Sequence, residues 1–110
     1  FQLSKECALA KRYIDSNYSQ NITLDSLAEI THINKFYLAH SFTECVGQSP
    51  INYLTDRRLE ACKELLVSSN LSVAQVATSV GFSSQSYFSQ IFRKKTGMTP
   101  RQYRNRYARK

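Results

Sequence analysis

Two short helical segments separated by Gly81 constrain the fold of this chain more than any other feature. Ser72 and Gln75 have the spacing of a capping box, in which each side chain satisfies a free amide at a helix start. Gly81 supplies a left-handed residue that ends this first helix, and Ser83 is placed to cap the second. Helical spacing of apolar residues defines one buried face on each segment. These faces consist of Val73, Val76, Ala77 and Val80, and of Phe88, Ile91 and Phe92.

Two short helices joined by a turn that contains Gly are typical of a helix-turn-helix, whose second helix can enter the major groove of DNA. At about 100° per residue, a polar stripe lies opposite the apolar face of the second helix. The stripe contains Ser86, Ser89, Gln90 and Arg93, and no acidic residue. The pattern therefore favours a polyanion as the partner.

Charge is divided unevenly along the chain. All eight acidic residues precede residue 65, whereas eight basic residues and no acid follow from Leu65 onward. Residues 1–64 thus carry −1 and residues 65–110 carry +8. Such asymmetry attracts polyanions, of which nucleic acid is the usual one. A solvated basic tail is the alternative explanation of the charge alone.

Other chemistries find little support in the sequence. Cys7, Cys45 and Cys62 form no CxxC pair, which fits a reducing compartment. With His32 and His40 as the only histidines, no zinc spacing results, and we expect neither a metal nor a cofactor. No catalytic constellation or phosphate-binding Gly loop is found, so we expect no enzyme. The sequence also contains no apolar run of about 18 residues, and nothing at Phe1 resembles a signal peptide.

The first half of the chain predicts four helices. Residues 4–16 place apolar side chains at helical spacing. Capping residues then precede the next three helices, and a proline follows the last of these caps, where its fixed φ suits the first helical position. We expect Thr23 to start a second helix, Asn34 to start a third that ends at Gly47, and Ser49-Pro50 to start a fourth.

An internal repeat relates the two halves. Leu27 and Ala28 recur 49 positions later as Val76 and Ala77, and six further residues recur after 50 positions, so the second turn holds one extra residue. A repeated pattern is stronger evidence than one helix-turn-helix motif, which has a high false-positive rate. The six pairs are Leu38/Phe88, Phe42/Phe92, Gly47/Gly97, Ser49/Thr99, Pro50/Pro100 and Tyr53/Tyr103.

The second half contains a set of residues at fixed spacing, namely Val76, Ala77, Val80, Gly81, Phe82, Ser84, Ser86, Tyr87, Phe88, Phe92, Arg93, Lys94, Gly97, Thr99, Pro100, Tyr103 and Arg104. This set closely resembles the C-terminal signature of AraC/XylS-type bacterial transcription regulators. The resemblance extends over about residues 5–106, and the neighbourhood of Arg58, Leu59 and Cys62 resembles the linker helix of that family.

We predict an all-α fold of about seven helices, in which a linker helix joins two helix-turn-helix lobes. A linker of about 18 residues is about 27 Å long, and successive major-groove faces are about 34 Å apart. Two unlike recognition helices could then read successive groove segments of one asymmetric promoter site. The domain covers residues 1–110, with lobes at about 4–49 and 71–108, the linker at about 50–67, and recognition helices at about 35–46 and 84–95.

Eight residues are candidates for base contacts. In the first recognition helix they form the outward stripe and its edge, and in the second they occupy positions from which the resemblance implies base contact. Phe36 could meet thymine methyl groups, unless it packs on the fourth helix, and Gln pairs with adenine geometrically. Many relatives carry Arg where this chain has His40, so their half-site preference does not transfer. The candidates are Lys35, Phe36, Ala39, His40, Gln85, Ser86, Ser89 and Gln90.

Seven further residues are candidates for phosphate contacts. Basic side chains late in the second recognition helix suit phosphates better than bases, and hydroxyls at helix starts lie beside free amides. Solvated side chains that contact nothing remain the alternative for the base candidates Ser86, Ser89 and Gln90. The phosphate candidates are Thr23, Thr43, Ser72, Arg93, Lys94, Lys95 and Thr99.

We expect double-stranded DNA as the partner and a bacterial cytoplasmic, nucleoid-associated location. The resemblance also implies contact with RNA polymerase and a separate N-terminal sensing or dimerising region. The start at Phe1 fits a piece of a longer protein. A helical protein-interaction module and a non-specific nucleic-acid binder remain the alternatives. Salt dependence separates the first from a DNA binder, and sequence preference separates the second.

Overall fold

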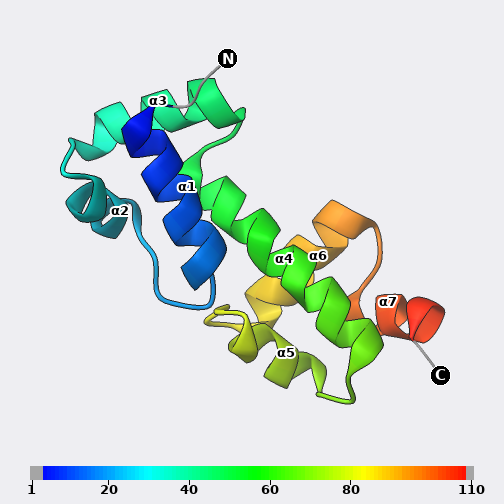
Figure 1. Cartoon of the computed structure of the whole chain (residues 1–110). Coiled ribbons are helices and arrows are strands. Elements are labelled where there is room, and N and C mark those ends of the chain that lie inside the picture. The colour runs from blue at the N-terminus through cyan, green and yellow to red at the C-terminus, as the bar shows by residue number, and fades with distance from the viewer. Residues whose placement is uncertain (1–3, 109–110) are drawn as a thin grey trace. The chain divides into compact units, whose positions relative to one another are not determined.

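The computed structural model describes residues 4–108 and shows seven helices and no strand within them (Figure 1). The predicted all-α fold class is therefore confirmed. Arg109 and Lys110, counted above in the basic half, lie outside the described residues. The helices are α1 (Lys5–Asn17), α2 (Leu24–Thr31), α3 (Lys35–Val46), α4 (Pro50–Ser68), α5 (Val73–Ser79), α6 (Gln85–Thr96) and α7 (Pro100–Tyr107).

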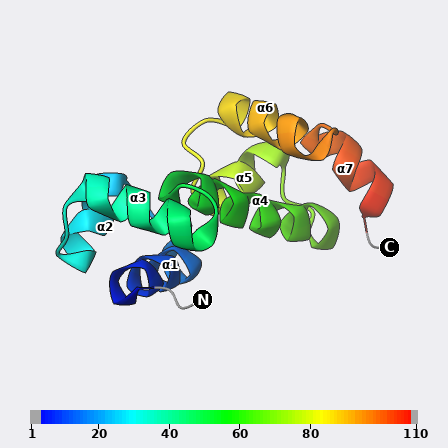
Figure 2. The ribbon, with the colours of Figure 1, turned by 90° about the horizontal axis from the view of Figure 1, so that it is seen from above.

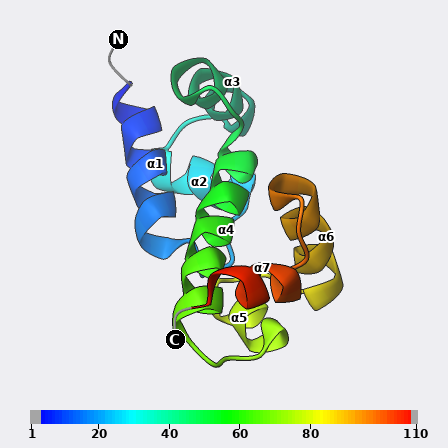
Figure 3. The same cartoon turned by 90° about the vertical axis from the view of Figure 1, so that its right-hand side faces the viewer.

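The chain divides within α4 into two compact units, Phe1–Arg57 (unit 1) and Arg58–Lys110 (unit 2). In unit 1, α1, α2 and α3 pack on one another, as Figure 2 also shows. In unit 2, α5 packs on α6 and α6 packs on α7, and Figure 3 shows these three helices from another side. The prediction of two helix-turn-helix lobes joined by a linker helix is confirmed, because α4 begins in unit 1 and ends in unit 2.

Each unit has its own apolar core, as the helical periodicity predicts. Burial of these side chains is the main driving force for assembly of the short helices, which are marginal in isolation. The linker α4 contributes Leu54 to the core of unit 1 and Leu59, Cys62 and Leu66 to buried positions in unit 2. The remaining buried apolar residues are Cys7, Ala10, Ile14, Ile22, Leu27, Leu38 and Phe42 in unit 1, and Val76, Ala77, Val80, Phe82, Phe88 and Phe92 in unit 2.

A polar cluster joins α1 to the first half of α4. The Tyr53 hydroxyl donates to Asp15 Oδ1 at 2.5 Å, and Arg57 Nε lies 3.1 Å from the same oxygen. Lys11 Nζ lies 3.5 Å from Asp15 Oδ2 and sits over the Tyr53 ring. Burial raises the pKa of Tyr53, and the hydrogen bond to Asp15 raises it further. One carboxylate thus holds three partners and fixes the start of α4 against α1.

An aromatic series runs through unit 2. Neighbouring rings lie 5.2 to 5.6 Å apart between centroids from Phe82 through Phe88 and Phe92 to Tyr103. Such tilted and edge-to-face pairs add about 0.5–1.5 kcal/mol each beyond the burial of their area. Cys62 of α4 is also fully buried in unit 2, and burial raises the pKa of its thiol to about 12. The series attaches α6 and α7 firmly to the core beneath the outward face of α6.

Four of the predicted helix caps are confirmed, and one is wrong. Thr23 and Ser72 form capping boxes with Ser26 and Gln75, Asn34 accepts two amides of α3, and Ser49 Oγ accepts the Asn52 amide. Thr99 forms a third box with Gln102 and precedes Pro100. The prediction that Ser83 caps the sixth helix is wrong. Ser84 is the N-cap and accepts from the Tyr87 amide at 3.2 Å, because buried Phe82 belongs to the core and the chain needs one more residue before α6.

The helix ends agree with the glycine pattern, apart from one residue. Gly47 and Gly97 adopt φ of 93° and 80° after α3 and α6, and Gly81 adopts 103° after α5. After α2 the corresponding left-handed residue is His32, at φ 60°. A left-handed conformation costs a non-glycine residue about 1–2 kcal/mol. The turn after α2 thus places His32 in the left-handed conformation that Gly81 adopts after α5.

Candidate nucleic-acid interface

The outward face of α3 carries the residues that the sequence predicts there. Phe36, His40 and Thr43 are exposed, while Ala39 is half-buried. Phe36 is 71% exposed, which excludes the alternative that it packs into the core against α4. Two amides of this first turn, those of Phe36 and Tyr37, donate to Asn34 Oδ1 at 2.8 and 3.3 Å. The cap thus fixes the turn that presents an exposed aromatic ring.

Lys35 is held by α2 at the edge of this face. Its Nζ lies 3.1 Å from Asp25 Oδ1 and 5.4 Å from the centroid of the Phe36 ring. The ion pair is exposed, so it contributes little stability, but it compensates part of the charge that Lys35 offers to DNA. Asp25 lies in the first turn of α2, where its charge also suits the helix dipole.

His40 faces an acid that the site prediction did not include. Its Nε2 lies 3.0 Å from Glu44 Oε1, one turn further along α3. The spacing of four residues was visible in the sequence and is the signal that could have identified the pair. Thr43 is also engaged, because its hydroxyl donates to the Ala39 carbonyl at 2.8 Å. Together with Lys35, three of the predicted contacts on α3 thus have intramolecular partners.

The outward face of α6 is more open. Gln85, Ser86 and Gln90 are exposed and Ser89 is half-buried, while Phe88 and Phe92 beneath them are fully buried. α6 contains no Asp or Glu. The face is therefore polar, uncharged along its first two turns and supported by a rigid aromatic layer. Such a surface can offer amide and hydroxyl groups to the edges of bases.

The basic phosphate candidates lie together in the last part of α6. Arg93, Lys94 and Lys95 are exposed there. Basic residues in a last turn also stabilise the helix through its dipole, so their position alone does not require a ligand. The hydroxyl candidates Thr23, Ser72 and Thr99 each accept the amide three residues later, at 3.0 to 3.1 Å. A hydroxyl that accepts one amide still has a proton to donate.

Two exposed tyrosines were missed by the site prediction. Tyr37 is 62% exposed on α3 and Tyr87 is 51% exposed on α6. They occupy equivalent positions of the 50-residue repeat, which is the signal that could have identified them. The centroid of the Tyr87 ring also lies 6.1 Å from the centroid of the Phe82 ring. Both helices thus present a tyrosine beside the predicted base contacts.

The charge imbalance follows the boundary between the units. Unit 1 contains five Lys and Arg against six Asp and Glu, a net charge of −1. Unit 2 contains ten against two, a net charge of +8. The equivalent positions Glu44 and Lys94 show the same contrast within the two recognition helices. Long-range attraction of a polyanion is therefore a property of unit 2.

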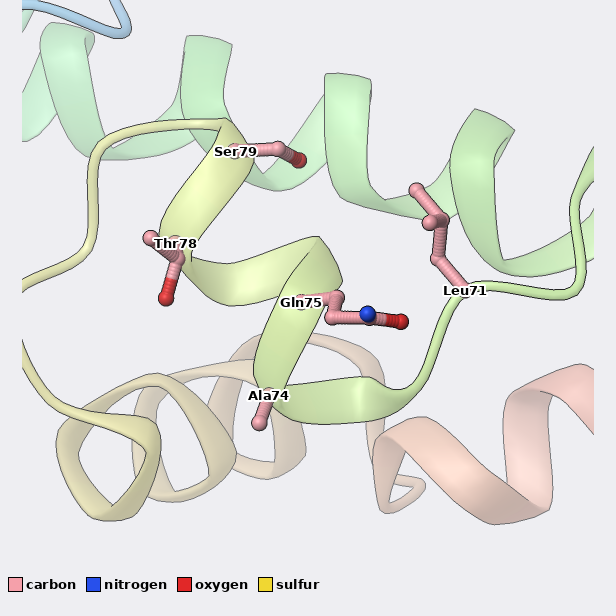
Figure 4. A pocket seen from close by; sticks show the side chains of 5 residues that line it. All are labelled: Leu71, Ala74, Gln75, Thr78 and Ser79. Atoms are coloured by element: carbon pink, nitrogen blue, oxygen red, sulfur yellow. The ribbon is translucent and has the colours of Figure 1, made fainter.

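A separate hollow of about 440 Å³ lies against α5 (Figure 4). It is lined by none of the predicted DNA contacts and by no charged residue. Residues 4–108 contain no group of three or more His, Cys, Asp or Glu side chains that could hold a metal ion. None of the helices described is long and apolar enough to cross a membrane. The hollow is lined by Leu71, Ala74, Gln75, Thr78 and Ser79.

Known proteins resemble this chain in both sequence and fold. A "Bifunctional transcriptional activator/DNA repair enzyme AdaA" of Bacillus subtilis is 34% identical over 96 residues, which cover 87% of this chain and 46% of that protein. The chain therefore spans about half the length of this relative. The C-terminal domain of AraT, a response regulator from Geobacillus stearothermophilus, has a TM-score of 0.95 at 36% sequence identity. The match covers 100% of this chain and 92% of the AraT chain.

A third comparison includes DNA. The DNA-binding domain of AdpA, described as a global transcriptional factor in complex with a target DNA, has a TM-score of 0.89 at 25% identity. The match covers 94% of each chain. The helix-turn-helix domain family matches residues 27–106, which include α3, α4, α5 and α6 in full. The chain therefore belongs to the helix-turn-helix domain family, and it is a DNA-binding domain of the AraC type.

Proposed function

We propose that the domain binds double-stranded DNA sequence-specifically to regulate transcription, with α3 and α6 in successive major-groove segments of one asymmetric promoter site. The observation that carries the proposal is the acid-free outward face of α6, which lies over buried Phe88 and Phe92 in the unit of charge +8. A flat polar face on a firmly packed helix suits base readout, and the surrounding charge suits the phosphate backbone.

On α6, Gln85, Ser86, Ser89 and Gln90 are proposed to contact base edges. Glutamine can donate to and accept from adenine in the major groove, whereas serine adapts to several bases. Arg93, Lys94 and Lys95 would meet phosphates beside the groove and fix the register of the helix. Ser72 and Thr99, each at the start of a neighbouring helix, would donate their remaining hydroxyl proton to phosphates.

On α3, Phe36 and His40 are the principal proposed base contacts, with Lys35 and Ala39 at the edge. An exposed phenyl ring and a methyl group both suit thymine C5-methyl groups. Contact of His40 with a base would require its imidazole to leave Glu44, and contact of Thr43 with a phosphate would require its hydroxyl to leave Ala39. Thr23 is proposed as a phosphate contact at the start of α2. Because unit 1 carries a net charge of −1, α3 is proposed to contribute to specificity more than to affinity.

The remaining proposals concern the whole protein. One domain covering residues 1–110, with lobes at about 4–49 and 71–108 and a linker at about 50–67, remains our proposed organisation. A regulator of this kind would carry a further sensing or dimerising region, contact RNA polymerase and work at the bacterial nucleoid in the cytoplasm. We propose no enzymatic activity for this chain.

Selection of bound duplexes from a random pool of about 25 base pairs tests the proposal. Two unlike half-sites about one helical turn apart should be enriched. The affinity of the selected duplex, followed by fluorescence anisotropy, should fall with salt at a slope of about −0.9 per phosphate contacted. A steep slope without enrichment would indicate a non-specific nucleic-acid binder. Failure to bind DNA at any salt concentration would favour a protein-interaction module.

A set of substitutions tests which half-site α3 and α6 each contact. Gln90→Ala should relax sequence preference in one half-site, and His40→Ala in the other, by about 1–3 kcal/mol of discrimination at the contacted pair. Lys94→Gln should weaken all duplexes about equally and reduce the salt slope by about one. If Gln90→Ala and His40→Ala change the same base pairs, the proposal of two separate groove segments is wrong.

A further inference from the structure

Arg101 occupies a fixed and exposed position at the start of α7. It is the second residue of the helix, between Pro100 and the capping-box residue Gln102. The Thr99 hydroxyl accepts the Gln102 amide at 3.1 Å, and the Gln102 side chain accepts the Thr99 amide at 2.9 Å. Pro100 is buried, whereas Arg101 is exposed. The backbone that carries this guanidinium is therefore held, while its side chain faces solvent.

Two hollows in unit 2 share Arg101 as a lining residue. One has a volume of about 320 Å³ and is also lined by Gln85 and Ser89, two of the proposed base contacts on α6. The other has a volume of about 360 Å³ and is also lined by Ser72 and Arg104. Arg101 thus connects the face of α6 with the start of α5, where Ser72 is a proposed phosphate contact.

Arg104, which lines the second hollow together with Arg101, has no acidic partner among the described residues. Arg104 Nε donates to the Leu66 carbonyl at 2.9 Å, and its Nη2 is buried without a hydrogen-bond partner. Within residues 4–108 no carboxylate lies within ion-pair distance of Arg104, and the chain contains no acid after Glu64. A buried guanidinium nitrogen without a partner is costly, and a nearby anion lowers that cost.

We propose that Arg101 is a further DNA-backbone contact, which holds a phosphate beside these two hollows and extends the interface from α6 onto the first turn of α7. The proposal rests on the proposed function. The planar guanidinium can bind a phosphate through two parallel hydrogen bonds, so the contact would fix the register of α6 in the groove as well as add affinity. Arg104 would strengthen the local field without touching the phosphate.

Arg101→Gln tests the proposal, with Arg106→Gln as the control of equal charge change. Arg106 is exposed on the same helix, and its Cζ lies over the Tyr107 ring, 5.6 Å from the ring centroid. On a duplex selected by the wild-type chain, Arg101→Gln should lose about tenfold in affinity at ~100 mM salt and about 0.9 of the salt slope. Arg106→Gln should keep the wild-type slope. Equal slopes for all three proteins, or equal losses for both variants, would overturn the proposal.

Ethylation interference locates the contact. Ethylation of the phosphate held by Arg101 should weaken binding of the wild-type chain and of Arg106→Gln, but cause no further loss in Arg101→Gln. Arg101→Lys keeps the charge and should retain the slope, which provides a second variant if glutamine disturbs α7. An interference pattern in Arg101→Gln that is identical to the wild-type pattern would reject the assignment. Absence of any enrichment or binding by the wild-type chain would instead reject the proposed function itself.

Discussion

His40 Nε2 lies 3.0 Å from Glu44 Oε1 on the outward face of α3, so the proposed base contact is paired with an acid one turn away. The equivalent position on α6 is Lys94. An acid on a DNA-facing surface repels phosphates and retains the imidazole that would otherwise meet a base. We therefore expect the pair to reduce the affinity that α3 contributes.

Replacement of this acid should strengthen DNA binding. Glu44→Gln removes the repulsion and frees His40, and we expect an increase in affinity of up to about fivefold, the range of an exposed charge interaction. The measurement is anisotropy on the selected duplex. Glu60→Gln is the control, because Glu60 pairs with Lys63 in an exposed contact on α4. If Glu44→Gln binds no better than Glu60→Gln, Glu44 does not face the DNA.

Exposed Phe36 and buried Phe88 should separate function from stability. Phe36→Ala should leave the free energy of unfolding within about 0.5 kcal/mol of wild type, because its ring is exposed. It should nevertheless lose preference at one position of the selected site. Phe88→Ala should cost about 3–5 kcal/mol, because it leaves a cavity between Phe82 and Phe92. Urea unfolding and repeated selection measure both effects, and a large loss of stability in Phe36→Ala would contradict its exposure.

The helix starts could be predicted because capping is local. Thr23, Asn34, Ser72 and Thr99 each accept an amide two or three residues away, so sequence spacing contains the whole interaction. The start of α6 was missed by one residue, since the number of turn residues depends on burial of Phe82 in the core. The left-handed conformation of His32 was not predicted either, because no glycine marks that turn.

The candidate faces were predictable, but their partners were not. Helical periodicity alone places Phe36 and Gln90 outward, and both are exposed. The contact of Lys35 with Asp25 depends on how α2 packs on α3, and periodicity contains no information about that packing. Hydrogen bonds between residues 38 apart, such as Tyr53 to Asp15, are likewise invisible to local spacing.

The carboxylate of Asp15 should be important for stability but not for DNA specificity. Asp15→Asn removes the charge that holds Arg57 and Lys11 and weakens the hydrogen bond from Tyr53. We expect a loss of about 1–2 kcal/mol in the free energy of unfolding, since the side chain is still 33% exposed and partly screened. The base preference of the folded protein should be unchanged.

Chemical denaturation and duplex selection test this separation. Glu60→Gln, whose ion pair with Lys63 is more exposed, should cost under about 0.5 kcal/mol. A stability of Asp15→Asn equal to that of Glu60→Gln would show that the cluster does not hold α1 to α4. A changed site preference would instead assign the cluster a role in positioning α3.

The buried thiol of Cys62 should make the protein less stable at alkaline pH. Burial raises its pKa from an ordinary 9.0 to about 12, so the folded chain retains a proton that the unfolded chain releases. The stabilising contribution is therefore complete below pH 9 and is lost progressively as pH rises toward 12. Between pH 9 and 11 the wild-type chain should lose up to about 1 kcal/mol per pH unit more than Cys62→Ala, as measured by urea unfolding at each pH. Val76→Ala, another truncation of a fully buried side chain, removes no titrating group and should keep the wild-type slope. Equal slopes for Cys62→Ala and Val76→Ala would show that the Cys62 thiol ionises alike in the folded and unfolded chains.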